Sequence, residues 1–223
     1  MAVTLDQRLG RLGGACAWLA AAAFAVRGLL AWDAGLPPSE GTAILAWLGA
    51  HLTTLRWAVE VTFFAMMFLV PALVALTVRV ARTHPVHAVV GASAWTVTIV
   101  LPAMAVVVEG RLVFPVLGIA LRAADVAELV VALDFGAWHA IRLVEVVATL
   151  AVGLGAWRRT DARLVAWSAL FVAVADVAAA YPEAIGASGL LACDIVSALW
   201  LLAAGRWLLG AAELDTVSGS AAA

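Results

Sequence analysis

Two short strings of ionisable residues have the spacing that chemistry would need. In HAIRLVE, the residues His139, Arg142 and Glu145 recur every three positions, so they lie on or near one face of a helix. A related string earlier in the chain, HLTTLRWAVE, holds the same three residue types: His51, Arg56 and Glu60. Inside a bilayer such groups are costly unless they face one another or water. We therefore expect both strings to line one polar cavity inside a membrane protein.

The composition of the chain points to a lipid environment. Of its 223 residues, 65% are hydrophobic and only 13% are charged, whereas soluble domains carry about 25% charged residues. We expect an all-α, polytopic membrane protein, because in lipid only helices and closed barrels satisfy their own backbone. The net charge of −2 gives no indication of a nucleic-acid partner. Cys16 and Cys193 fall inside apolar runs, which favours two buried thiols over a disulfide or a metal motif.

The apolar runs predict a single helical bundle over residues 12–209 with about six transmembrane spans. Their approximate ranges are 12–32, 52–78, 89–108, 136–157, 164–181 and 185–207. Residues 1–11 form a short polar N-terminus, 42–50 an interfacial helix, and 210–223 a tail that is expected to be disordered. The apolar segment 112–121 is too short to cross, at ~1.5 Å per residue, so it is re-entrant or interfacial. A seven-span topology, with 112–134 crossing, is the alternative.

Arginine placement sets the expected orientation. With six spans, most arginines collect on the side of the two termini: Arg8, Arg11, Arg79, Arg82, Arg158, Arg159, Arg163 and Arg206. The positive-inside rule then puts both termini in the cytoplasm and the protein in the cytoplasmic membrane. A seventh span would break this bias.

The ionisable residues of the spans gather in the outer half. Four acids are expected there on four different spans: Glu60, Glu145, Asp176 and Asp194. An uncompensated charge at the bilayer centre costs ~2.5–3.5 kcal/mol, so these acids need partners. Arg56 and Arg142 are the expected counter-charges, paired across helices as Arg56 with Glu145 or Arg142 with Glu60. Arg27 is a third cation that can instead snorkel to the interface.

These residues define the predicted site. The four acids are the candidate catalytic or proton-carrying groups. Six further residues are candidates for ligand binding: Arg56, Arg142, His139, Trp57, Phe64 and Trp200. Carboxyls in a dry pocket can act as general acids, and aromatic faces stabilise cations. No haem, other cofactor or metal is predicted, since His51 and His139 lie at span ends and no metal-ligand spacing occurs.

Three functions are open for this cavity, whose expected partners are membrane lipid and a small or lipophilic molecule. In the first, the protein binds or processes that molecule. In the second, it transports the molecule with protons, carried by the intramembrane acids. In the third, the charges are only an ion-pair network that fixes helix packing in a structural subunit. Assembly into a homo-oligomer is compatible with each of them.

Two resemblances bear on this choice. Glu60 in RWAVEVTFF and Asp194 in LACDIVSALW lie at places similar to the essential acids of integral-membrane terpene cyclases, which have a Glu in an early span and an Asp in the last. This resemblance implies an enzyme that uses Glu60 and Asp194 for acid catalysis. The overall pattern also resembles small multi-pass membrane proteins of unknown function from high-GC bacteria, which implies a fold and no activity.

Overall fold

The computed structural model is helical over most of the residues that it describes, which are 5–115, 117 and 121–220, with the backbone alone for 211–220. Six long helices follow one another in this order: α1 (Leu5–Ala34), α2 (Gly41–Ala81), α3 (Pro85–Val113), α4 (Ala124–Ala156), α5 (Arg163–Ala179) and α6 (Pro182–Ser220). A short 3-10 helix, Thr160–Ala162, precedes α5. Within this described part of the chain, six helical segments are long and apolar enough to cross a bilayer. The prediction of an all-α, multi-pass membrane bundle with six spans is therefore confirmed.

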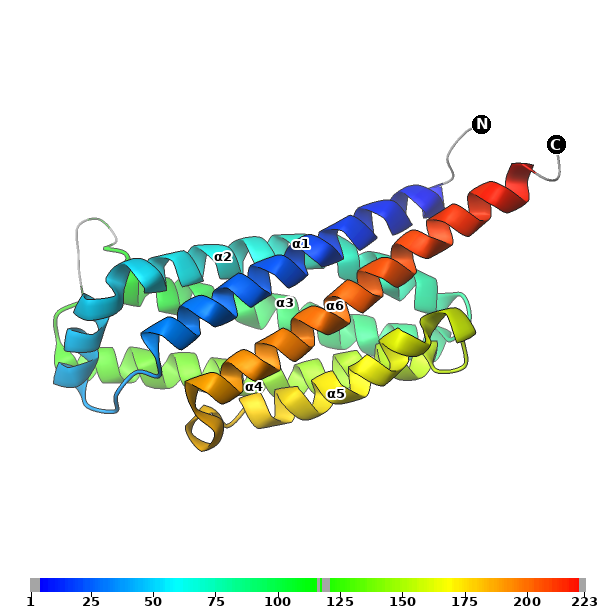
Figure 1. The fold of residues 1–223 in the computed structure, drawn as a ribbon. Coiled ribbons are helices and arrows are strands. Elements are labelled where there is room, and N and C mark those ends of the chain that lie inside the picture. The colour runs from blue at the N-terminus through cyan, green and yellow to red at the C-terminus, as the bar shows by residue number, and fades with distance from the viewer. Residues whose placement is uncertain (1–4, 116, 118–120, 221–223) are drawn as a thin grey trace.

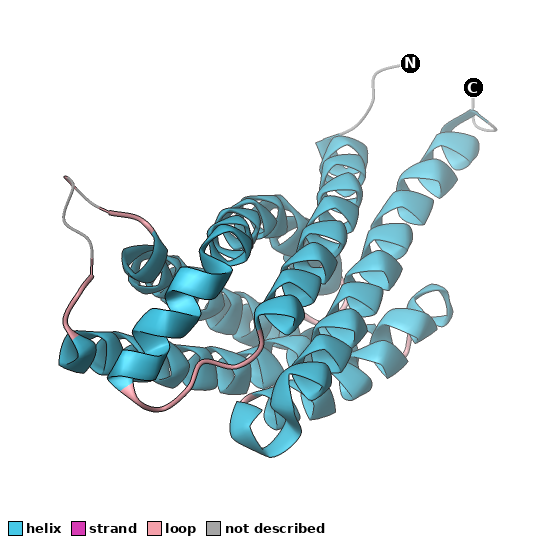
Figure 2. Cartoon of the chain, turned by 60° about the vertical axis from the view of Figure 1, so that its left-hand side comes forward, coloured by secondary structure: helices cyan, strands magenta, loops and turns pink. Residues whose placement is uncertain are grey.

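The six helices form a ring in chain order (Figure 1). Helix α1 packs between α2 and α6, each helix from α2 to α5 packs against the next one, and α2 also contacts α4. Both chain ends lie at the same end of the bundle, which we call the terminal end. The loop 35–40 and the α5–α6 turn lie at the opposite end, which Figure 2 brings toward the viewer. An even number of spans accounts for this arrangement.

Helices α2 and α4 are longer than the predicted spans. Residues 42–50, expected as a separate interfacial helix, are the first turns of α2, which bends at His51 (φ −112°, ψ 16°). Helix α4 begins at Ala124 and not near residue 136. No proline interrupts the sequence between these two positions, so the polar residues there do not end the helix. Residues 124–135, which lie outside the predicted spans, are thus part of the helix that forms the fourth span.

These added turns cover the opposite end of the bundle. The backbone N–H of Gly41 donates to Glu128 Oε1 at 2.6 Å and ties the start of α2 to α4. Ile44 and Ala127 are buried in the apolar cluster between the two helices. A Cβ at Gly41 would overlap the carbonyl group of Ala124. The close approach of the two helices is therefore possible because glycine has no Cβ.

Two other predictions concern segments near the ends of helices. The segment 112–121 begins as the last residues of α3, which ends at Val113; residues 116 and 118–120 lie outside the described residues, and the re-entrant or interfacial placement is untested. The tail expected to be disordered from residue 210 is helical as far as Ser220. Good helix formers in 211–214 (Ala, Ala, Glu, Leu) allow α6 to continue past the span. Residues 221–223 lie outside the described part of the chain.

The core of the terminal half is packed from aliphatic and small side chains. Leu76, Val152 and Val165 are buried there, and a Cβ at Gly13 would overlap the side chain of Ala75. Small residues at such contacts let membrane helices approach closely. Within the described residues, four charged residues are buried: Asp134 and Arg142 on α4, Asp176 near the end of α5, and Asp194 on α6.

Candidate functional site

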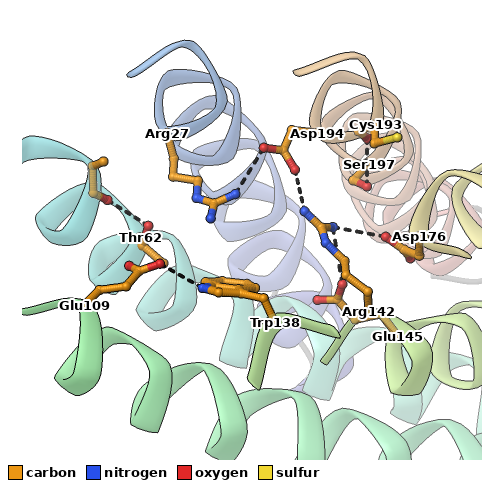
Figure 3. A network of polar contacts seen from close by, with 11 residues as sticks. Arg27, Thr62, Glu109, Trp138, Arg142, Glu145, Asp176, Cys193, Asp194 and Ser197 are labelled. Carbon is orange, nitrogen blue, oxygen red and sulfur yellow. Dashed lines mark hydrogen bonds and ion pairs between the residues drawn. The ribbon is translucent and has the colours of Figure 1, made fainter. Parts of the chain in front are cut away.

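Arg142 is the centre of a buried ion-pair cluster (Figure 3). Its guanidinium comes from the middle of α4 and donates to three carboxyls: Asp194 Oδ1 at 2.5 Å, Asp176 Oδ1 at 3.0 Å and Glu145 Oε2 at 3.4 Å. Arg27 Nη1 on α1 donates to the other oxygen of Asp194, Oδ2, at 3.2 Å. These five residues, which we call the Arg142 cluster, fix the positions of α1, α4, α5 and α6 relative to one another.

The Arg142 cluster is largely removed from solvent. The side chains of Asp176 and Asp194 are only 2% and 5% exposed, and that of Arg142 is 11% exposed. Burying two opposite charges costs more than their attraction returns unless the remaining hydrogen-bonding positions are also filled. Here both terminal nitrogens of Arg142 and both oxygens of Asp194 have partners. These hydrogen bonds offset the cost of burying the charges, so the Arg142 cluster is compatible with a stable fold.

Glu109 on α3 and Asp134 on α4 form a second acidic group with fewer partners, which we call the acidic pair. Trp138 Nε1 donates to Glu109 Oε1 at 2.7 Å. The ring of Trp138 also contacts Arg27, whose Cζ lies 4.7 Å from the ring centroid. Asp134 precedes Trp138 by one turn of α4 and is 9% exposed. Its Oδ1 has no hydrogen-bond partner among the described residues.

A cavity of about 170 Å³ is lined by residues of both groups. The polar part of its wall consists of Arg27, Glu109, Asp134, Trp138, His139, Arg142 and Asp194. The rest of the wall is mostly apolar, with Trp47, Leu55, Val131 and Phe135 among its members. A mostly apolar wall with a few convergent polar groups is typical of sites that bind small molecules. Four helices, α1, α3, α4 and α6, supply the polar groups.

A second, smaller space of about 50 Å³ lies on the other side of the Arg142 cluster. It is lined by Trp95 and Trp200, whose rings stack with centroids 6.0 Å apart. Neither indole N–H has a hydrogen-bond partner within the described part of the chain. This space is large enough for water and too small for most organic ligands. Trp200, predicted to bind the ligand, thus lies behind the cluster and does not line the larger cavity.

The structure brings four of the predicted site residues together: Arg142, Glu145, Asp176 and Asp194. His139 also lines the cavity, and its Nδ1 lies 2.8 Å from the carbonyl oxygen of Ala180. Both predicted cross-helix pairs are wrong, however. Arg142 pairs with the acids of α5 and α6 and not with Glu60, and Arg56 donates through Nε to the carbonyl oxygen of Val113 at 3.0 Å and not to Glu145.

Three predicted residues lie on the outer surface of α2 and not in the cavity. Trp57 and Phe64 are 60% and 54% exposed, and Glu60 between them is also exposed. Their spacing of three and four residues places them on one helix face. The opposite face of α2 carries the buried residues Val59 and Thr62, so the rotation of this helix turns Glu60 away from the other acids.

Three functional candidates were missed from the sequence: Glu109, Asp134 and Trp138. Glu109 lies just beyond the predicted third span (89–108), and Asp134 just before the predicted fourth (136–157). Arg27, expected to snorkel, belongs instead to the Arg142 cluster. One signal for α4 was present, because Asp134, Trp138, Arg142 and Glu145 are separated by four, four and three residues. That spacing describes one continuous polar stripe on a helix that begins near residue 124.

Comparison of the chain with protein-family models, with curated proteins and with solved structures gives no match. The class of protein is therefore defined by the architecture alone. It is a multi-pass helical membrane protein whose charged residues surround a cavity. Within the described residues, no group of three or more His, Cys, Asp or Glu side chains is arranged to hold a metal ion.

Proposed function

We propose that this protein binds a small molecule in the cavity beside Arg142, in the outer half of the cytoplasmic membrane. The observation that carries this proposal is the cavity itself, into which ionisable groups of four helices converge. The orientation follows from the arginines, which favour a cytoplasmic terminal end under the positive-inside rule. The cavity then faces the outer leaflet.

A purely structural ion-pair network is the simplest competing function. Such a network would leave every charge paired and no space of ligand size. The Arg142 cluster alone fits that description. The acidic pair does not, because Asp134 lines the cavity and its buried Oδ1 has no hydrogen-bond partner among the described residues. The cavity and this carboxyl together favour ligand binding.

Acid catalysis by Glu60 and Asp194, as in the terpene cyclases, has less support. Glu60 is exposed on α2 and is not part of the cavity wall. Asp194 accepts hydrogen bonds from the guanidinium groups of Arg27 and Arg142. A carboxylate held by two cations is poorly suited to give up a proton to a substrate. The geometry therefore favours binding over this particular reaction.

The proposal is tested by filling the cavity. Ala31 lines it from α1, whereas Ala22 lies exposed on the same helix, so Ala31→Phe and Ala22→Phe add the same ring inside and outside the site. Small molecules extracted from purified wild-type protein and from both variants are identified by mass spectrometry. We expect at least one compound that accompanies the wild type and Ala22→Phe but not Ala31→Phe. Identical extracts from all three folded proteins would contradict ligand binding in this cavity.

A further inference from the structure

We infer, building on the proposed function, that the ligand of this cavity carries an ammonium group and that Glu109 and Asp134 hold it. The first argument is charge. Arg27 and Arg142 are the two arginines that line the cavity. Among the described residues, every ion pair that they form goes to Glu145, Asp176 or Asp194. Glu109 and Asp134 form no ion pair among the described residues, and Arg27, the cation beside them over the Trp138 ring, is shared with Asp194. Inside an apolar bundle this leaves room for a further cation.

The second argument is the geometry of the acidic pair. Asp134 is more than nine-tenths buried, its Oδ1 is unpartnered, and it lines the cavity. Glu109 reaches the same cavity from α3 and accepts one hydrogen bond, from Trp138. An ammonium group has donors but no acceptor, so it complements two carboxyls that have acceptors left to fill. Arg27 lies over the ring of Trp138, and its ion pair among the described residues goes to Asp194 of the Arg142 cluster.

The third argument concerns the kind of cation. Calcium takes six to eight oxygen ligands, and magnesium requires near-ideal octahedral geometry. The described residues offer no set of three metal-ligating side chains here. Beyond the acidic pair the wall is formed by apolar groups such as Trp47, Leu55 and Val131. A small organic amine with an apolar body matches both parts of the wall.

Size narrows the ligand class further. The cavity volume is about 170 Å³, and a dry protein cavity of about 150 Å³ is known to accept benzene. A single ring with a short aminoalkyl group is therefore of suitable size. Benzylamine, benzyl alcohol and benzoate share one ring and differ in charge, which makes them matched probes for the charge preference of the site.

The test measures binding of these three probes to the purified full chain at pH 7 by isothermal titration calorimetry. We expect benzylamine, protonated at this pH, to bind at least about ten-fold more tightly than benzyl alcohol, because a charge-assisted hydrogen bond is about that much stronger than a neutral one. Benzoate should bind more weakly than either. This comparison uses the wild-type protein, so it does not depend on the folding of a variant.

Variants then assign the charge preference to residues. Asp134→Asn and Glu109→Gln should each lower the affinity for benzylamine about ten-fold and leave that for benzyl alcohol unchanged. Glu60→Gln, which removes a carboxyl from the exposed face of α2, should change neither. Equal binding of amine and alcohol, with both lost in Ala31→Phe, would overturn the ammonium assignment and leave the ligand site standing. No binding of any probe, together with no extracted compound, would overturn both.

Discussion

The Arg142 cluster and the acidic pair both place carboxyls in an apolar bundle, where an unpartnered charge is costly. In the cluster, guanidinium groups from α1 and α4 contact all three carboxyls. In the pair, the indole N–H of Trp138 reaches Glu109, and Asp134 Oδ1 has no partner among the described residues. A carboxyl whose hydrogen-bond and ion-pair partners come from the protein supports the fold. A carboxyl beside a cavity that lacks such partners is suited to bind a ligand.

The largest effect should follow from removing the cation of the cluster. Arg142→Met leaves Asp176 without its guanidinium partner and Asp194 with Arg27 alone. Breaking a buried ion pair from one side typically costs about 3–5 kcal/mol. We therefore expect a large loss of the free energy of unfolding, measured by denaturant titration in detergent, or a failure to accumulate in the membrane.

A compensated double variant separates lost charge balance from lost packing. In Arg142→Met with Asp176→Asn, the carboxyl that depends on Arg142 is also neutralised. This double variant should be more stable than Arg142→Met alone, and Arg56→Met serves as a control at a half-buried arginine that donates to a backbone carbonyl. Wild-type stability of Arg142→Met would show that the cluster does not hold the bundle together.

A single type of substitution should have different effects in the two groups. Asp176→Asn replaces an acceptor of Arg142 by an amide and should destabilise by about 1–3 kcal/mol. Asp134→Asn replaces a buried carboxyl that forms no ion pair among the described residues, so ligand-free stability should stay within about 0.5 kcal/mol of the wild type or rise. Both are measured by thermal unfolding of ligand-free protein. Equal losses at the two positions would mean that the acidic pair is as structural as the cluster.

The sequence predicted the meeting of Arg142, Glu145, Asp176 and Asp194 because depth along a helix follows from the fixed rise per residue. The fold class and the number of spans followed from apolar length in the same way. The rotation of each helix about its own axis does not follow from rise per residue or from apolar length. In a membrane protein, the helix face that contacts lipid is as apolar as the face that packs against other helices. Hydrophobic periodicity therefore does not reveal which face of α2 points into the bundle.

The sequence also did not predict where α3 ends and where α4 begins. The predicted ranges 89–108 and 136–157 exclude Glu109 and Asp134 because hydropathy falls where they occur, although α3 and α4 continue through both positions. Burial of those added turns depends on packing between α2 and α4, as at Gly41 and Ala124. Contacts of this kind join residues far apart in the chain. They leave no local pattern in the sequence beyond the polar stripe along α4.

The smallest effect should come from Glu60, the acid that the sequence grouped with the others and the structure separates from them. Its neighbours on the same face, Trp57 and Phe64, are exposed, and no ion pair involves Glu60 among the described residues. Glu60→Gln removes a charge from a surface that faces lipid, which lowers the cost of insertion. We expect unchanged probe affinity and equal or greater accumulation in the membrane, measured beside Asp134→Asn. If Glu60→Gln lost probe binding and Asp134→Asn kept it, α2 would have to present its other face to the cavity.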